Sequence, residues 1–450
     1  MSSLKLTDGA VTDGVLVLGL SFNPNKASAL TIESGTVTID TRTLLAQLKE
    51  LGATGKSDEV IKIPGTRTKL ILFTGLGITS KDYSLETLRR AAGAAARALA
   101  GSSEATFALP ATDIASVAAI AEGAALGAYA FDEFRGSTKL ERKLPLASIA
   151  IHSKFSKKVE AKSALKRAQI IAQYTHLVRD LINTPPSHLT PDSFTKKISA
   201  AVKAVGGSSS SLKVSILNEK QLKSGGYGGI IGVGQGSANP PRLLHITYSP
   251  KKSLRTFAFV GKGITFDTGG LALKPAAGME AMKSDMSGAA AVCGAILAIA
   301  SLKLPVTIHA WAPLAENMVS DNATRPSDVI TIYGGKTVEV LNPDAEGRLV
   351  LADAIVKAQE TKSLDGLIDV ATLTGAQVVA LGTRTSAVMT NNEDFSARFI
   401  SAAKESGEAF WPMPLPQELR ASLDSPVADL ANIGERMGGM LVAGLFLKDF

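Results

Sequence analysis

The stretch Phe257–Gly270 reads FAFVGKGITFDTGG and carries the clearest fold signal in the chain. Its first four residues form an apolar run typical of a buried strand. Glycines on both sides of Lys262 and after Asp267 indicate that the backbone there approaches another group closely. Open α/β sheets bind ligands where strands run into such loops. We therefore expect a ligand site at the end of this strand.

Strand-like and helix-like segments alternate in the first third of the chain. Leucines at helical spacing predict a helix that stops at Gly52, Ser84 is placed to cap a second helix, and residues 114–131 predict a third. Gly75 closes one of the predicted strands. Four short apolar runs predict these strands: 15–20, 70–73, 106–109 and 147–151. The alternation predicts an α/β domain.

A long amphipathic pattern follows this domain. Apolar residues advance by three or four positions over residues 161–183, which predicts one helix, and Asn183-Thr-Pro-Pro186 ends it. A charged helix between two α/β patterns predicts a domain connector. We expect an N-terminal α/β domain at 1–160, the connecting helix at 161–183 and a second α/β domain at 184–450.

Cysteine usage and hydropathy favour a cytoplasmic protein. Cys293 is the one cysteine, so an intrachain disulfide is excluded, and its apolar surroundings favour a small buried side chain over a reactive thiol. Residues 1–20 lack the pattern of a signal peptide. The longest uncharged apolar run, Ser287 to Leu302, is shorter than the roughly 20 residues that span a bilayer. We expect no membrane segment.

The chain is basic, with a formal net charge of +7 and a pI of about 9.2. Its densest cation clusters, Lys157-Lys158 and Lys196-Lys197, are short, which favours a solvated surface over the alternative of a polyanion-binding face. Gly225–Gly236 does not follow the Gly-x-Gly-x-x-Gly pattern, so we interpret its glycines as turns and tight packing.

The five histidines do not predict a metal site, because none pair at ligand spacing and His-Glu-x-x-His is absent. Carboxylates are the better candidates. Asp285 precedes the apolar helix predicted at 289–299, and taken alone it is most simply an N-cap. Asp344 and Glu346 are two residues apart, so in an extended segment both would face one site, with Arg348 next in line. Taken alone, these three predict a surface salt-bridge cluster.

Considered together, these residues predict a metal site rather than separate caps and salt bridges. Four carboxylates, two lysines and an arginine gather on loops at the ends of predicted strands. Carboxylates this close cannot all stay ionised without cations, and hard divalent metals bound through oxygen would supply them. The pattern predicts a metal-dependent α/β enzyme.

The motifs resemble the leucyl aminopeptidase family, the cytosol aminopeptidases. Residues 260–270 resemble its first metal motif, 282–292 the second, 342–349 the signature around the last ligands, and 369–375 a stretch beside the substrate. Weaker similarity runs from about residue 165 to the end. The resemblance implies a smaller N-terminal α/β domain and a C-terminal α/β/α catalytic domain with a central mixed sheet.

The resemblance also implies roles for the metal ligands. Lys262 and Asp285 would bind the tighter metal, and Asp267 and Glu346 would bridge both metals. Asp344 would bind the second metal through its side chain and its backbone carbonyl. Lys262 must be neutral to act as a ligand, so metal binding should weaken at low pH. The ions implied are two divalent metals per subunit, zinc or manganese, with magnesium as a further candidate.

For the reaction, the resemblance implies that Lys274 and Arg348 are catalytic and that Lys274, Thr372, Leu373 and Gly375 contact the substrate. The metal pair would activate a water that attacks the first peptide carbonyl, while Lys274 stabilises the oxyanion. A bicarbonate at Arg348 would serve as general base. The implied function is release of N-terminal amino acids from peptides, with a leucine-type preference, by a homohexamer.

Two departures from the family pattern bear on this reading. Pro343 stands where the family has Thr, and its ring removes an N–H beside Asp344. The chain ends at Leu447-Lys-Asp-Phe450, where the family continues. Two alternatives stay open: a DNA-binding protein on the same scaffold, and a catalytically weak fragment that acts through assembly.

Overall fold

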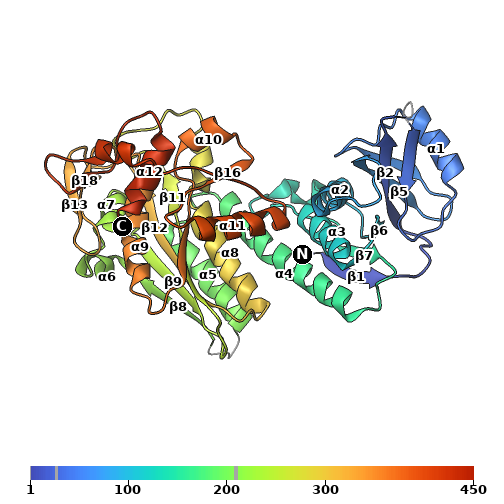
Figure 1. Ribbon diagram of the computed structural model, residues 1–450, viewed down its shortest axis with the longest axis horizontal. Coiled ribbons are helices and arrows are strands. Elements are labelled where there is room, and N and C mark those ends of the chain that lie inside the picture. The colour runs from blue at the N-terminus through green and yellow to red at the C-terminus, as the bar shows by residue number, and fades with distance from the viewer. Residues whose placement is uncertain (1, 26–28, 207–210) are drawn as a thin grey trace. The chain divides into compact units, whose positions relative to one another are not determined.

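A computed structural model describes residues 2–25, 29–206 and 211–450, and the chain divides into two compact units, Met1–His176 and Leu177–Phe450 (Figure 1). Each unit has its own main sheet and its own hydrophobic core clusters. The division falls inside one long helix, α4 (Val159–Asn183), where the amphipathic pattern predicted a helix over 161–183.

The first unit is built on a largely parallel sheet in the order β1-β7-β6-β2-β5-β4, with β3 paired to β2. Helices α2 and α3 pack on one of its cores, and α1 lies on the other. The elements are β1 (Ser3–Thr7), β2 (Val15–Asn23), β3 (Ala29–Glu33), α1 (Thr41–Glu50), β4 (Val60–Pro64), β5 (Leu70–Ile78), α2 (Leu85–Ala98), β6 (Glu104–Ala108), α3 (Ile114–Gly127), η1 (Ser137–Glu141) and β7 (Ser148–His152).

The strands and caps expected in this unit are present. Ser84 caps α2 by accepting from the Thr87 N–H, and Gly52 follows α1 with a φ of 71°. One prediction was wrong, because β5 continues through Gly75 to Ile78. Gly75 does not end the strand. It lets the backbone of β5 approach that of Lys56, since a Cβ on Gly75 would lie 1.7 Å from the Lys56 carbonyl oxygen.

The predicted helix at 114–131 is also shorter in the structure. Helix α3 ends at Gly127, and Ala128 leaves the helical region with ψ 57°. Aromatic residues follow, and the Phe131 ring packs against the Phe134 ring with centroids 5.8 Å apart. The chain instead makes a turn that the Arg135 N–H closes on the Asp132 carbonyl at 3.1 Å.

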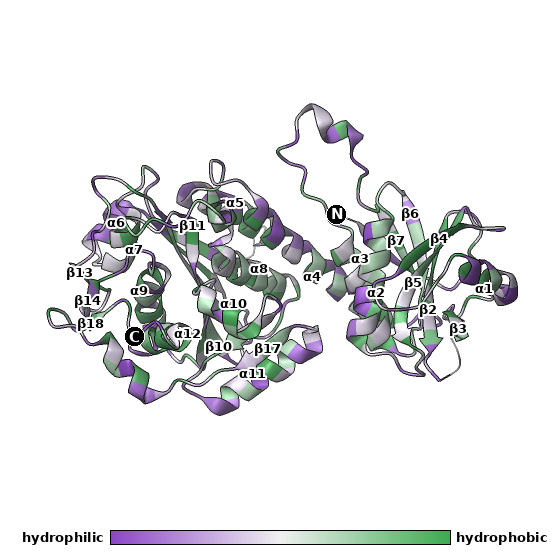
Figure 2. Cartoon of the chain, turned by 90° about the horizontal axis from the view of Figure 1, so that it is seen from above, coloured by the Kyte–Doolittle hydropathy of each residue, from purple (hydrophilic) through white to green (hydrophobic). Residues whose placement is uncertain are grey.

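The second unit has a mixed central sheet in the order β15-β10-β12-β9-β8, with β11 paired to β12. Strands β15, β10, β11 and β12 are parallel, whereas β9 and β8 are antiparallel to their neighbours. Helices α5 and α8 cover one face and α7 and α9 the other, which makes the predicted α/β/α arrangement (Figures 1 and 2).

The elements before the middle of this unit are α5 (Pro191–Gly206), β8 (Leu212–Leu217), α6 (Glu219–Ser224), α7 (Gly228–Gly234), β9 (Arg242–Tyr248), β10 (Thr256–Gly261), β11 (Gly263–Asp267), η2 (Met279–Ser284), α8 (Ser287–Ser301) and β12 (Thr307–Asn317). The later elements are β13 (Asp328–Thr331), β14 (Thr337–Val340), α9 (Gly347–Gln359), β15 (Gly366–Val370), α10 (Gly375–Leu381), β16 (Thr385–Val388), α11 (Glu393–Ser406), β17 (Ala409–Pro412), η3 (Gln417–Leu423), β18 (Leu430–Ala431) and α12 (Gly439–Lys448).

Glycines bring the helices of this unit close together. A Cβ on Gly229 would lie 2.2 Å from the Leu349 carbonyl oxygen, so α7 packs directly on the backbone of α9. The glycine-rich segment therefore serves tight packing, as predicted. Cys293 is buried in α8 with 1% of its surface exposed, also as predicted, and burial raises the pKa of its thiol.

Among the described residues, one stretch has the length and mean hydropathy of a membrane span, Met279–Ser301. It consists of η2 and α8, and 56% of its apolar window is buried inside the structure. Helix α8 contacts β10 and β12. The stretch therefore fits the central helix of a packed core.

Candidate metal centre

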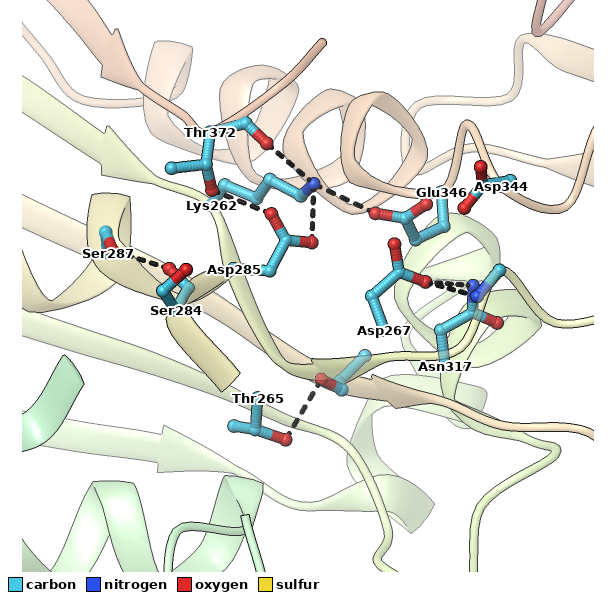
Figure 3. A network of polar contacts seen from close by, with 12 residues as sticks. Lys262, Thr265, Asp267, Ser284, Asp285, Ser287, Asn317, Asp344, Glu346 and Thr372 are labelled. Atoms are coloured by element: carbon cyan, nitrogen blue, oxygen red, sulfur yellow. Dashed lines mark hydrogen bonds and ion pairs between the residues drawn. The ribbon is translucent and has the colours of Figure 1, made fainter. Parts of the chain in front are cut away.

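The candidate site lies at the carboxyl ends of β10, β11 and β12 (Figure 3). Lys262 sits between β10 and β11, and Asp267 is the last residue of β11. The glycines around Lys262 act as predicted, because Cβ atoms on Gly261 and Gly263 would lie 2.4 and 2.5 Å from neighbouring carbonyl oxygens. Residues 263–267 form a strand rather than a loop, since they pair with β12.

Asp285 is not the N-cap of α8. Helix α8 begins at Ser287 after Met286, and no side chain caps it. The Asp285 carboxylate instead lies 2.8 Å from the Lys262 ammonium and accepts a 2.7 Å hydrogen bond from the Thr372 hydroxyl (Figure 3). Because η2 precedes Asp285, the residue turns its side chain into the site.

Asp344 and Glu346 face one site, but not for the reason that their spacing suggested. Residues 342–346 form a turn in which the Ala345 N–H donates to the Asn342 carbonyl at 3.0 Å, and Glu346 has a helical φ of −75°. The turn brings carboxylate oxygens of Asp267, Asp344 and Glu346 within 4.8 Å of one another. Asp267 and Glu346 are buried and Asp344 is half-buried, so they do not form the surface salt-bridge cluster that the pattern alone suggested.

Two ammonium groups hold the four carboxylates in two groups. The Lys262 ammonium lies 2.8 Å from Asp285 and 2.9 Å from Glu346, and it donates to the Thr372 carbonyl at 3.1 Å. The Lys274 ammonium lies 2.8 Å from Asp267 and forms an ion pair with Asp344. Glu346 belongs to both groups, because it also clusters with Asp267 and Asp344.

Burial governs the protonation of these groups. It raises the pKa of Glu346 to about 7 and that of Asp285 above its ordinary value, although Lys262 opposes both shifts. Burial also raises the pKa of Asp344 against the opposing Lys274. For the Lys262 ammonium, burial favours the neutral form, but Glu346 and Asp285 outweigh it and raise the pKa.

The residues fit a pair of divalent metals. Asp285 Oδ2, Asp344 Oδ1 and Glu346 Oε1 are buried, and none of them has a hydrogen bond of good geometry within the described residues. Their close partners are the two lysine ammoniums. Oxygen donors of this kind suit hard divalent cations, which would neutralise the same charge. Glu346 belongs to both the Lys262 group and the Lys274 group, and a two-metal site requires such a shared ligand.

Arg348 is buried beside this cluster, with 6% of its surface exposed. Its Nη1 donates a 2.8 Å hydrogen bond to the Asn432 carbonyl, and its Nε is buried without a partner among the described residues. Burial lowers the pKa of the guanidinium to about 10, so it stays charged at neutral pH. An unpartnered buried donor with a positive charge can bind an anion.

The predicted substrate residues lie beside the cluster or follow it in sequence. Thr372 contacts both Lys262 and Asp285. Leu373 packs partly buried against the core, and Gly375 begins α10 with open space where a Cβ would be. The structure therefore brings Thr372 to the cluster directly, whereas Leu373 and Gly375 follow it in sequence.

Two asparagines that the sequence did not reveal organise the site. The Asn317 amide donates to Asp267 at 2.8 Å and to the Pro343 carbonyl at 3.1 Å. The Asn432 side chain accepts from the N–H of Leu341 at 2.8 Å and donates to the Asn342 carbonyl at 2.7 Å. The partners of Asn317 and Asn432 lie tens of residues away from them in the sequence. No local sequence pattern could therefore have identified these two asparagines.

Two family models match the chain. The catalytic domain of the cytosol aminopeptidase family matches residues 176–450, and the N-terminal domain of that family matches residues 22–138. A probable cytosol aminopeptidase from Streptomyces avermitilis is 48% identical over 468 residues, which cover 100% of this chain and 90% of that protein. Another from Streptomyces griseus is 51% identical over 424 residues, 90% of this chain and 81% of that protein.

Two solved structures are also similar to this chain. The bottromycin maturation enzyme BotP in complex with Mn aligns with a TM-score of 0.84 and 34% identity over 97% of this chain and 89% of that one. A tomato leucine aminopeptidase mutant aligns with a TM-score of 0.85 and 31% identity over 100% of this chain and 89% of that one.

Proposed function

The chain belongs to the cytosol aminopeptidase family, and from that premise we propose how its site performs the reaction. The protein is a metal-dependent hydrolase that releases N-terminal amino acids from peptides. In our proposal two divalent ions are held by five side chains, namely Lys262, Asp267, Asp285, Asp344 and Glu346. The observation that carries this proposal is the position of Glu346, which is shared between the Lys262–Asp285 group and the Asp267–Asp344 group.

The ligand roles follow from these two groups. Lys262 and Asp285 would hold one ion, and Asp344 would hold the other through its carboxylate. Asp267 and Glu346 would bridge the ions, because each carboxylate offers two oxygen donors. The second oxygen of Asp267 accepts from Asn317, which would limit how far that carboxylate can turn.

The bound ions would supply Lewis-acid activation of water, at a pH where free water is not acidic enough to react. The chain's own residues do the rest. Lys274 is 2.8 Å from Asp267, so its ammonium can stabilise the negative charge that forms on the peptide oxygen. Arg348 would bind a small anion, with bicarbonate as our candidate general base, through its unpartnered Nε.

The proposal also covers the identity of the metal ions and the residues that contact the substrate. Zinc and manganese are the leading candidates, with magnesium as a further one; the manganese in the BotP complex supports this choice. Thr372, Leu373 and Gly375, together with Lys274, would contact the peptide. A leucine-type preference is supported by the likeness to a leucine aminopeptidase.

We also propose a domain division, an assembly and a location. The N-terminal α/β domain would span 1–160, the connecting helix 161–183 and the catalytic domain 184–450, consistent with family models that match 22–138 and 176–450. The chain would assemble as a homohexamer in the cytoplasm. Size-exclusion chromatography with light scattering tests the assembly.

A second candidate function, DNA binding, rests on the net charge of +7. A phosphate-binding role predicts affinity for duplex DNA that falls steeply with salt. Binding that is absent at 50 mM salt would remove this candidate without affecting the peptidase.

The test of the peptidase is hydrolysis of a leucine anilide by the purified chain after metal removal, before and after manganese or zinc is added back. Glu346→Ala is the test variant and Glu360→Ala, at an exposed ion pair with Lys357, is the matched control. We expect metal-restored turnover in the wild type and the control but not in Glu346→Ala. No turnover of the wild type with any metal would overturn the proposed mechanism.

A further inference from the structure

The Met1–His176 unit contains a cavity of about 340 Å³ that the peptidase reaction does not use. It is lined by three loops, the turn after β3, the loop after β6 and the end of β7. Its lining includes Ile32, Glu33, Thr36, Leu109, His152 and Lys154. A volume of this size is in the range of small-molecule sites.

The cavity lies where ligands bind in open α/β sheets. Strands β5 and β6 flank β2 on opposite sides, all parallel to it. From β2 the chain first turns back through the antiparallel β3 and then continues to β4 and β5, whereas from β6 it continues to β7. The parallel strands that follow β2 and β6 therefore lie on opposite sides of this pair. Divergent connections at the carboxyl ends of parallel strands mark the usual ligand crevice of such a sheet.

Strand pairing explains why the space exists. Strand β6 pairs with β2 only at Leu16–Leu18, and β3 pairs with the rest of the same edge from Gly19 to Asn23. The turn after β3 therefore meets the end of β6. Gly35 allows this approach, since its φ is 57° and a Cβ there would lie 2.7 Å from the Leu109 carbonyl oxygen.

The polar groups of the lining are fixed in place. His152 is buried, and its Nε2 donates to the Gly9 carbonyl at 3.2 Å while its Nδ1 pairs with the Thr36 hydroxyl at 2.9 Å. The Glu33 carboxylate accepts from the hydroxyls of Ser21 and Tyr83, both at 2.9 Å. Both hydroxyls donate to Oε1, so this oxygen of Glu33 is supplied with donors from residues outside the lining.

Donors remain for a ligand. Gly35 and Thr36 are the exposed central residues of the turn that the Val37 N–H closes on the Ser34 carbonyl. Among the described residues, their backbone N–H groups and that of Ala111 have no protein acceptor. Lys154 adds an exposed ammonium to the same lining, and its Nζ lies 5.1 Å from the centre of the Phe155 ring. Unused N–H groups and an ammonium around one cavity suit an oxygen-rich anion.

We propose that this cavity binds a small organic anion through a phosphate or carboxylate group placed beside Lys154 and the two loops. The apolar lining, Ile32, Leu109, Pro110 and Ala111, would contact the body of the same ligand. The site is separate from the metal centre and does not depend on the peptidase mechanism.

The test is titration of the zinc-loaded full chain with three probes, followed by saturation-transfer NMR. Glycerol 3-phosphate represents the phosphate source, glutarate the carboxylate source, and glycerol is the neutral comparison. Saturable binding of either anion, with none of glycerol, is expected and identifies the source. Binding of neither anion, or equal binding of glycerol, overturns the proposal.

Three variants locate the site. Lys154→Gln should weaken anion binding about tenfold, the cost of one charge-assisted hydrogen bond. Lys158→Gln is the matched control, because Lys158 contacts the same Phe155 ring at 5.2 Å but does not line the cavity. Thr112→Trp, at an exposed lining position, should block the cavity by volume.

All three variants should keep the peptidase activity of the wild type, and a wild-type urea-unfolding transition shows that the Met1–His176 unit is folded. Unchanged anion affinity in both Lys154→Gln and Thr112→Trp would place the anion elsewhere, for example at Arg348 in the metal centre, and would overturn the proposal.

Discussion

The Asn317 side-chain amide donates a 2.8 Å hydrogen bond to the Asp267 carboxylate. The same nitrogen donates to the Pro343 carbonyl at 3.1 Å, so one buried side chain ties the end of β11 to the turn that carries Asp344. Asn317 is only 5% exposed. We infer that it holds the two metal-binding segments at a fixed separation.

Asn317→Ala should therefore weaken metal binding. Groups that orient metal ligands typically contribute a factor of about 10 to 100 in affinity. Titration calorimetry of the metal-free variant with zinc or manganese measures the change directly. Asn218→Ala is the control, because Asn218 caps α6 far from the metal ligands and its loss should cost about 1 kcal/mol of stability. Equal metal affinity in the two variants would rule out the positioning role.

Asn432 organises the turn from the opposite side. It is fully buried, accepts from the N–H groups of Leu341 and Asn342, and donates to the Asn342 carbonyl. Asn432→Ala would leave these backbone groups unpaired and should lower the free energy of unfolding by about 2–4 kcal/mol. We also expect kcat to fall more than KM rises, because Arg348 and Glu346 follow the turn.

Urea unfolding and steady-state kinetics of Asn432→Ala check both effects. Asn322→Ala, at an exposed position in the same unit, should change neither. A destabilised variant with wild-type kcat would show that Asn432 supports the fold but does not position the catalytic groups.

The sequence predicted much of the site because its signals are local. Glycines close to Lys262 and Asp267 in the sequence indicated close backbone approach. The structure confirms it, since a Cβ at Gly261 or Gly263 would clash with a neighbouring carbonyl oxygen. The strand that precedes them is an apolar run that local pattern identifies well.

Other features of the site depend on contacts between residues far apart in the sequence, which a local pattern does not encode. Asp285 looked like a helix cap because polar residues before an apolar helix usually are caps, yet its partner Lys262 lies 23 positions earlier and overrides that role. The extended conformation inferred for Asp344 and Glu346 was wrong, since Asn432, 86 positions after Glu346, folds the segment into a turn. Such long-range contacts decide geometry but leave no periodic signal.

Stability of the Leu177–Phe450 unit should depend on pH through His245. Burial, followed by the nearby His309 and Lys357, lowers the pKa of His245 to about 3. The ring stacks on Trp311 with centroids 3.6 Å apart, and it pairs with His309 and with the Thr247 hydroxyl. A folded-state pKa below the unfolded value of about 6.5 means that the unfolded state binds more protons below that pH.

The stabilisation is therefore present above pH 6.5 and is lost as the pH falls from 6.5 toward 3, with an upper limit of about 5 kcal/mol. His245→Phe keeps the stacking on Trp311 and removes the titration, so its unfolding free energy should fall less between pH 7 and 4. His188→Asn, at an exposed histidine, should keep the wild-type profile. Parallel profiles for the wild type and His245→Phe in urea unfolding would contradict this account.

A substitution at Gly347 should change metal affinity much more than the free energy of unfolding. A Cβ at this position would lie 2.3 Å from Cε and 2.7 Å from Nζ of Lys262. These atoms are the end of a flexible side chain, so Gly347→Ala should displace the lysine rather than strain the backbone. We expect a change in unfolding free energy of about 1 kcal/mol or less, together with a clear loss of affinity at the metal that Lys262 would ligate.

Gly229→Ala is the reciprocal control, since its Cβ would meet the Leu349 carbonyl oxygen at 2.2 Å. That contact is with backbone, which cannot move aside cheaply, so the variant should lose about 1–3 kcal/mol of stability while the folded fraction binds metal normally. Calorimetric metal titration and urea unfolding of both variants give the comparison. If Gly347→Ala binds both metals with wild-type affinity, Lys262 is not a metal ligand in this chain, and the carboxylates alone must hold the ions.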